Sequence, residues 1–319
     1  MKILVTVPFE EADRQRAAAI WPEAEFCYAQ AASLTPEDVA DVEIGLGNIP
    51  VPLLPACKKL RWLQLNNAGV DNYIGHLPEG LILTNATGAY GLAISEHMLA
   101  MLLMLMKKLN RYYDNQHAHL WRDEGAIRSI EGSTALILGA GNIGGDFARK
   151  LHALGAYTIG VRRASTKKDD YLDELWHMDA IDALLPRADI VAMALPGTPE
   201  TKGIIDARRI GLMKKTAILL NIGRGTAIDT EALCDALQEG RLGGAGLDVT
   251  DPEPLPKEHR LWDMPNVVVT PHISGFYHLR QTYERIVGIC LENLTNYRDG
   301  KPLRNIVDEA TGYRALREE

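Results

Sequence analysis

The stretch TALILGAGNIGGDFARKLHALGAYTIGV, residues 134–161, decides the fold. Thr134–Leu138 is an apolar run of strand length, and GAGNIG follows it directly at residues 139–144. Phe147–Leu154 has helical spacing, and Tyr157–Val161 is a second apolar run. A strand, a G-x-G-x-x-G turn, a helix and a second strand together predict a dinucleotide-binding βαβ unit.

The three glycines of this turn have distinct physical roles. Gly139 permits the tight turn, Gly141 lets the backbone approach a pyrophosphate, and Gly144 lets the helix pack closely on the strand. Asn142 and Ile143 open the helix, whose unpaired N–H groups and positive dipole end favour phosphate. The alternative is a glycine-rich turn that binds nothing, but the flanking strand and helix favour nucleotide binding.

Short apolar runs alternate with helical segments along the rest of the chain. Strands are expected at 3–7, 42–46, 62–65, 81–84, 190–194, 217–221, 246–249 and 267–269, with helices at 10–19, 94–110, 201–213, 230–239 and 279–297. This alternation predicts an α/β fold of two Rossmann-like or flavodoxin-like domains with doubly wound parallel sheets. The segment Ile94–Asn110 is apolar around most of its circumference, which suits a helix between domains or subunits.

Composition excludes several classes of protein. The 319 residues are 46% hydrophobic and 24% charged, with a formal net charge of −8, which disfavours nucleic acid or anionic membrane as a partner. The longest strongly apolar stretch, Met98–Met106, is too short to span a bilayer, and the N-terminal MKILVTVP is expected to be a strand and not a signal peptide. The four cysteines show no metal-binding spacing, so we expect reduced thiols, no metal and a cytoplasmic protein.

The end of the second strand bears on which nucleotide binds. A chain that binds NAD usually places an acidic residue there, about 20 residues after the glycines, to hold the ribose 2′-OH. Here the sequence is GVRRAST, with Arg162 and Arg163 at that place and Ser165 and Thr166 as further hydroxyl donors. Guanidinium groups can hold a 2′-phosphate, so we expect NADP(H) to be preferred over NAD(H). The alternative is a solvated basic turn that does not affect cofactor choice.

Three polar residues follow expected strands of the nucleotide-binding half: Arg224 in NIGRG, Glu253 in GLDVTDPEPL and His272 in TPHISG. Ligands of open α/β sheets bind at the carboxyl ends of the strands. A guanidinium can hold a carboxylate and polarise the adjacent carbonyl, an imidazole can deliver a proton, and a nearby carboxylate favours the imidazolium. Each residue alone has a structural alternative, but together they predict a site that reduces a 2-oxo acid.

The segments GAGNIG, LPGTPETKGIID, LLNIGRGTAID, GGAGLDVTDPEPL and TPHISG occur in this order. In order and spacing, the chain resembles the D-isomer-specific 2-hydroxyacid dehydrogenase family over essentially its whole length. The resemblance implies hydride transfer between a nicotinamide cofactor and C2 of a 2-oxo acid, with Arg224 orienting the substrate and His272, paired with Glu253, as acid and base.

The resemblance also implies further contacts. Asp248 would hold the nicotinamide carboxamide, and the first half would bind the substrate carboxylate on the backbone of Ala68, Gly69 and Val70, with Leu46–Ile49 nearby. A glycine in that loop allows close approach of the backbone to an anion. The other residues expected to line the cofactor site are Leu195, Pro196, Thr201, Ile222, Ser274 and Gly275.

The domain organisation expected from this resemblance is discontinuous. Residues 1–97 with 279–319 would bind substrate, residues 98–278 would bind NAD(P), and the active site would lie in the cleft between the domains. Residues 98–130 resemble the family's dimerisation arm, which predicts a homodimer in which Trp121 packs at the interface or approaches the partner's site.

The sequence argues against some of the activities found in this family. Formate dehydrogenases of this fold carry Gln in place of Glu253, and regulated phosphoglycerate dehydrogenases add a domain for which 319 residues leave no room. Glyoxylate/hydroxypyruvate reductases match the arginine-containing turn, so a small 2-oxo acid is the expected substrate. The rival function is a nucleotide-sensing scaffold like the C-terminal-binding-protein corepressors, and an amino-acid dehydrogenase is disfavoured by the three polar motifs.

Overall fold

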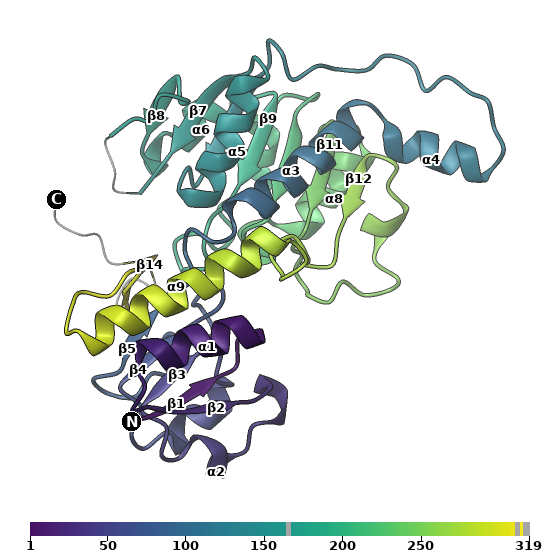
Figure 1. The fold of residues 1–319 in the computed structure, drawn as a ribbon. Coiled ribbons are helices and arrows are strands. Elements are labelled where there is room, and N and C mark those ends of the chain that lie inside the picture. The colour runs from purple at the N-terminus through teal and green to yellow at the C-terminus, as the bar shows by residue number, and fades with distance from the viewer. Residues whose placement is uncertain (164–166, 310–312, 315–319) are drawn as a thin grey trace. The chain divides into compact units, whose positions relative to one another are not determined.

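The computed structural model describes all residues except 164–166, 310–312 and 315–319. The chain divides into two compact units (Figure 1). Unit 1 comprises Met1–Tyr90 and Tyr277–Glu319, and unit 2 comprises Gly91–Phe276. That unit 1 binds substrate and unit 2 binds the cofactor remains a prediction.

Unit 1 is built on a five-stranded parallel sheet with strand order β2-β1-β3-β4-β5. The strand order reverses between β1 and β3, and ligands of such sheets bind beyond the carboxyl ends of the strands at that point. The strands are β1 (Lys2–Val5), β2 (Glu25–Tyr28), β3 (Ile44–Leu46), β4 (Trp62–Gln64) and β5 (Ile82–Thr84). A short antiparallel pair, β13 (Val307–Asp308) and β14 (Tyr313–Arg314), lies near the end of the chain.

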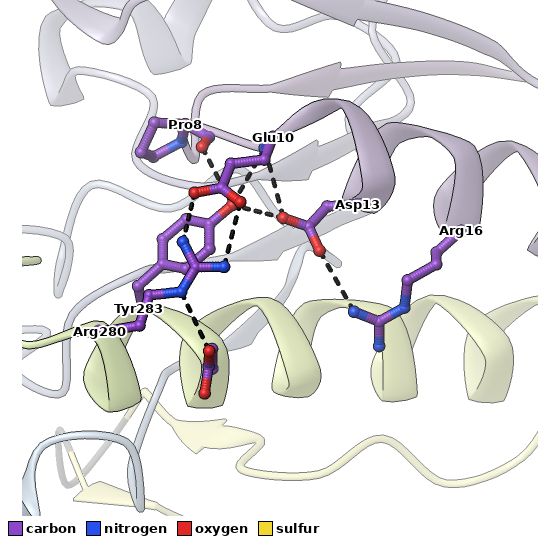
Figure 2. Close-up of polar contacts among 7 residues, drawn as sticks. Pro8, Glu10, Asp13, Arg16, Arg280 and Tyr283 are labelled. Carbon is purple, nitrogen blue, oxygen red and sulfur yellow. Dashed lines mark hydrogen bonds and ion pairs between the residues drawn. The ribbon is translucent and has the colours of Figure 1, made fainter.

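Two helices from opposite ends of the sequence, α1 (Glu11–Ile20) and α9 (Arg280–Arg298), lie side by side in unit 1 (Figure 1). Figure 2 shows how the first turns of α9 are joined to α1 by polar contacts. The Arg280 guanidinium pairs with both carboxylate oxygens of Glu10, and the Tyr283 hydroxyl donates to the carboxylate of the buried Asp13. These contacts fix the returning chain against the segment that follows β1. A third helix, α2, spans Pro36–Val39.

Unit 2 contains a seven-stranded parallel sheet with strand order β12-β11-β10-β9-β6-β7-β8. This is the doubly wound order of a Rossmann sheet with one added edge strand, and it reverses between β6 and β9. The two parallel sheets confirm the predicted α/β fold class. The strands are β6 (Thr134–Leu138), β7 (Tyr157–Val161), β8 (Glu174–Trp176), β9 (Ile190–Met193), β10 (Ile218–Asn221), β11 (Gly244–Leu247) and β12 (Val267–Val269).

The first helical segment of unit 2 differs from the expected pattern. The prediction of a single helix over 94–110 is wrong. The helix α3 ends at Met106, and Lys108 has a left-handed backbone, with φ of 56°, before α4 begins. In Figure 1, α4 projects from the rest of unit 2. The helices are α3 (Gly91–Met106), α4 (Leu109–His117), α5 (Asn142–Ala153), α6 (Ile181–Leu184), α7 (Ala207–Leu212) and α8 (Thr230–Gln238).

Two other expected boundaries are corrected. The helix expected over 201–213 begins only at Ala207, because the Asp206 carboxylate caps it by accepting a hydrogen bond from the backbone N–H of Arg209 at 2.8 Å. The strand expected over 246–249 is β11, which ends at Leu247 and therefore places Asp248 directly beyond the strand.

No helix within the described residues is long and apolar enough to cross a membrane. The four cysteines are free thiols, and Cys27 alone among them is partly exposed.

Candidate active site

The glycine turn between β6 and α5 has the geometry of a phosphate-binding loop. Gly139 has φ of +90°, and a Cβ there would lie 2.6 Å from the Ala194 carbonyl oxygen. A Cβ on Gly144 would lie 2.3 Å from the Gly139 oxygen, so these two glycines are required by packing. At Gly141, apart from the glycine and its two neighbours in the chain, no heavy atom of the described residues lies within 4 Å of the corresponding position. Packing therefore does not require the middle glycine, and the space beside it fits the approach of a phosphate to the N-terminus of α5.

The loop after β7 contains an ion pair that was not expected. The Arg162 Nε donates to the Ala140 carbonyl at 2.5 Å, and Nη1 donates to the Lys167 carbonyl at 3.1 Å. Its Nη2 pairs with the Asp169 carboxylate, which lowers the pKa of Asp169. Arg163 is exposed, and the expected hydroxyl donors Ser165 and Thr166 lie outside the described residues. The strand end lacks a carboxylate, as expected, but Asp169 brings one to Arg162 from the following loop.

The residues expected to line the cofactor site after β9 and β10 are mostly buried. Leu195 and Ile222 are 6% and 8% exposed. The Thr201 hydroxyl donates to the Pro196 carbonyl at 2.7 Å and accepts from the Thr198 amide at 2.9 Å. In this structure Thr201 therefore closes the turn that follows β9, and its contact with a cofactor remains a prediction.

Arg224 follows β10 and lies between two glycines in close backbone contact with neighbouring loops. A Cβ on Gly223 would lie 2.4 Å from the Leu195 oxygen, and a Cβ on Gly225 would lie 1.9 Å from the Thr250 oxygen. The Arg224 carbonyl accepts from the Asn221 side-chain amide at 2.9 Å, and its Nη1 donates to the Gly223 carbonyl at 2.8 Å. The backbone around Arg224 therefore has little room to move, and the guanidinium donates one hydrogen bond back to that backbone.

Glu253 and His272 form a direct pair in unit 2. His272 Nδ1 lies 2.5 Å from Glu253 Oε1, and the two side chains are 48% and 40% exposed. Glu253 follows β11 and His272 follows β12, so the two residues come from neighbouring parallel strands. With Nδ1 held by the carboxylate, Nε2 is the imidazole nitrogen left for proton exchange with a ligand. The expected pairing of these two side chains is thus present in the structure.

Asp248 organises the loop that carries His272. Its carboxylate is 1% exposed and accepts hydrogen bonds from the Thr270 hydroxyl at 2.5 Å, the Ile273 amide at 3.0 Å, and the Ser274 amide and hydroxyl at 3.1 and 2.5 Å. Its backbone carbonyl accepts from the His272 amide at 2.8 Å. The expected nicotinamide contacts of Asp248, Ser274 and Gly275 remain predictions, whereas the structure shows Asp248 positioning the loop.

His97 of α3 joins this network, and the sequence analysis missed it. Its Nε2 lies 2.9 Å from the Thr270 hydroxyl oxygen and 3.8 Å from Asp248 Oδ1. Because the Thr270 hydroxyl donates to Asp248, it accepts from His97, which makes a hydrogen-bonded chain from α3 to the buried carboxylate. The loop it supports includes His272 with φ of 51°, a left-handed conformation that costs energy in a non-glycine residue.

In unit 1, the loop after β4 is held by its carbonyl groups. The Asn66 carbonyl accepts from the Tyr90 hydroxyl, and that of Asn67 accepts from the Ala86 amide at 3.0 Å. The Ala68 carbonyl accepts from the Asn85 side chain at 2.8 Å, and that of Gly69 accepts from the Asn67 side chain. Asn48, after β3, accepts from the Asn66 amide at 3.1 Å, which places the expected loop 46–49 beside it.

Comparison with known proteins agrees with this geometry. A family model described as the NAD-binding domain of D-isomer-specific 2-hydroxyacid dehydrogenases matches residues 99–274. A glyoxylate reductase from Aeropyrum pernix is 33% identical over 274 residues, which cover 82% of this chain and 80% of that protein. The chain therefore belongs to the D-isomer-specific 2-hydroxyacid dehydrogenase family, as the sequence motifs predicted.

Solved structures show the same architecture. A D-isomer-specific 2-hydroxyacid dehydrogenase family protein from Aeromonas salmonicida is 32% identical with a TM-score of 0.86, over 97% of this chain and 99% of that chain. An NADPH-dependent glyoxylate/hydroxypyruvate reductase from Sinorhizobium meliloti, solved with NADP and sulfate, is 27% identical with a TM-score of 0.82, over 98% and 99%. These findings support a nicotinamide cofactor for this chain. Among the described residues, no group of His, Cys, Asp and Glu is arranged to hold a metal ion.

Proposed function

We propose that the protein reduces a small 2-oxo acid to the D-2-hydroxy acid, with NADPH as the preferred reductant. The observation that carries the proposal is the His272–Glu253 pair at 2.5 Å. Glu253 follows β11, which pairs with the strand that precedes Arg224, and His272 follows β12, the next strand in the sheet. When bound, the nicotinamide supplies the hydride. The residues that would hold the cofactor are those of the turn at Gly139–Gly144, where the space beside Gly141 fits a phosphate.

The three polar residues divide the remaining work. Arg224 would hold the substrate carboxylate and polarise the neighbouring carbonyl through its paired N–H groups. His272 would give the proton on Nε2 to the carbonyl oxygen as that oxygen becomes a hydroxyl. Glu253 also keeps the imidazole oriented through Nδ1. Asp248 would contribute by holding the His272 loop in place.

The loop after β4 supports a second carboxylate contact. In a trans peptide the carbonyl and the following N–H point in opposite directions. The carbonyls of Asn67, Ala68 and Gly69 are bonded within unit 1, so the N–H groups of Ala68, Gly69 and Val70 point away from those partners. Among the described residues, none accepts a hydrogen bond from these three amides. Three adjacent unpaired N–H groups suit a carboxylate, which supports the proposed role of this loop.

A homodimer is part of the proposal. The segment 98–130 presents large apolar side chains to solvent, including a fully exposed Trp121, and such a surface favours a protein contact. The other exposed members are Met104, Leu109, Tyr113, Leu120 and Ile127. Light scattering after size exclusion should give twice the mass of one chain, and Trp121→Ser with Ile127→Ser should shift the protein toward the monomer.

The test of the reaction is oxidation of NADPH and NADH with glyoxylate, hydroxypyruvate, pyruvate, phenylpyruvate and 2-oxoisocaproate, followed by chiral analysis of the product. We expect turnover with the smaller acids at about 1 mM or below, the D product, and a higher kcat/KM with NADPH. His272→Gln should lower kcat by about 10²- to 10⁴-fold while NADPH binding persists. Binding of NADPH without turnover of any acid would contradict the proposed reaction and favour a nucleotide-sensing scaffold.

A further inference from the structure

The Arg162 guanidinium is restrained on three sides. Its Nε is bonded to the Ala140 carbonyl of the glycine turn, its Nη1 to the Lys167 carbonyl and its Nη2 to Asp169. The side chain is only 16% exposed. Arg162 therefore lies against the glycine turn in a conformation that Asp169 stabilises, rather than extending freely from the end of β7.

Asp169 is itself held in place from a second direction. The Tyr171 hydroxyl donates to Asp169 Oδ2 at 3.0 Å. Tyr171 in turn packs near α5, because a Cβ on Gly145 would lie 2.7 Å from its hydroxyl oxygen. The Asp169 carboxylate nevertheless remains 38% exposed. It is thus an ordered, accessible negative charge in direct contact with the arginine that is expected to recognise a 2′-phosphate.

We infer that Asp169 is a specificity-determining residue, which weakens the preference for a 2′-phosphorylated cofactor by competing with that phosphate for Arg162. This inference rests on the proposed use of Arg162 in cofactor binding. While Asp169 holds Nη2, a 2′-phosphate can bond Arg162 fully only if the ion pair loosens. A ribose 2′-hydroxyl has no such conflict and can donate to a carboxylate. The same residue therefore disfavours NADP and tolerates NAD.

The test is the binding of NADP⁺ and NAD⁺, measured by calorimetry on the whole protein without substrate. Asp169→Asn keeps the size of the side chain and removes its charge. We expect this variant to lower the Kd for NADP⁺ by about 3- to 20-fold, as for one partly screened charge, with the Kd for NAD⁺ unchanged or raised. The affinity of the variant for the fragment 2′,5′-ADP should rise by the same factor, whereas its affinity for 5′-AMP should not change.

Asp170→Asn is the matched control, because it makes the same charge change at an adjacent, exposed position. It should shift the NADP⁺/NAD⁺ affinity ratio less than twofold. In the Arg162→Ala background, Asp169→Asn should lose most of its effect, because the competition acts through Arg162. Thermal unfolding of each variant checks that the fold persists, and Asp169→Ser provides a second neutral substitution.

The inference is overturned if Asp169→Asn and Asp169→Ser leave the affinity ratio within twofold of wild type, or if Asp170→Asn shifts it equally. A failure of this inference can be told apart from a failure of the proposed NADPH preference. If wild-type protein binds NAD⁺ more tightly than NADP⁺, the proposed NADPH preference fails, yet Asp169→Asn must still move the ratio toward NADP⁺.

Discussion

Gly225 offers a direct test of how the backbone positions Arg224. Its backbone is not left-handed, so an alanine can adopt the same conformation and space is the remaining obstacle. The added Cβ would lie 1.9 Å from the Thr250 oxygen, 2.0 Å from the Thr250 carbonyl carbon and 2.7 Å from the Asp251 nitrogen. Ordinary contact begins at 3.4 Å, so one of the two loops must move by about 1.5 Å. Neither neighbour is a flexible side-chain end, because all three atoms belong to the backbone.

That displacement separates the Arg224 loop from the loop that leads to Glu253. A misplacement of about 1 Å in a catalytic group can cost about 10²-fold, so we expect Gly225→Ala to lower kcat/KM for a 2-oxo acid by about this factor. Overpacking of a buried contact costs about 1–3 kcal/mol. For a domain of this size that corresponds to a fall of about 2–12 °C in the unfolding midpoint.

The assay measures the thermal midpoint without cofactor and steady-state kinetics with the best 2-oxo acid of the panel. Gly211→Ala is the control, because Gly211 is an exposed residue of α7 and no described atom beyond the adjacent backbone of that helix lies within 4 Å of its Cβ position. That variant should keep wild-type kinetics and gain up to about 1 kcal/mol from helix propensity. If Gly225→Ala has an unchanged midpoint and a kcat/KM within twofold of wild type, the contact does not constrain Arg224 and our reasoning is wrong.

Three further predictions follow from other contacts. Glu253→Gln should lower kcat at least tenfold with little change in cofactor Kd, because His272 Nδ1 loses the carboxylate that orients the imidazole; a wild-type kcat would make Glu253 a turn residue. Thr270→Val should lower kcat by about tenfold or more with little change in cofactor Kd, because it breaks the chain between His97 and Asp248; wild-type kcat would show that this network does not position His272. Arg187 lowers the pKa of Glu174 to about 2, so this pair stabilises the fold above about pH 4.5 and the effect is lost as pH falls toward 2. Glu174→Gln should therefore cost on the order of 1 kcal/mol at pH 6 and progressively less in acid, as measured by unfolding midpoints across pH.

The strands that are buried on both faces were predictable because their apolar content leaves one interpretation. The bounds of β6 and β7, which lie inside the sheet, agree with the expected ranges to the residue, and so do those of the edge strand β12, whose three residues are all valine. The edge strands β2 and β8 were missed, since their sequences EFCY and ELW begin with an acidic residue and are mostly half-exposed in the structure. A short edge strand depends on its neighbour for pairing, and that neighbour is not visible in local sequence.

The break between α3 and α4 shows a different limit. No glycine or proline marks residues 106–109, and the apolar pattern continues through Leu109. The left-handed Lys108 is held by tertiary contact, because its Nζ donates to the Glu124 carbonyl. A conformation that a distant loop stabilises cannot be inferred from the helical periodicity around it.

The candidate site was predictable where topology alone brings residues together. Arg224, Glu253 and His272 each follow a parallel strand, and carboxyl ends of such strands share one edge of the sheet, so chain order sufficed to group them. His97 comes from a helix more than 150 residues before Thr270, and no local pattern links the two. Asp169 is seven residues from Arg162, but a loop's path determines whether two charges at that spacing meet. A strand-end rule therefore predicts the groups that would contact a ligand, whereas the residues that hold those groups in place depend on how the loops pack.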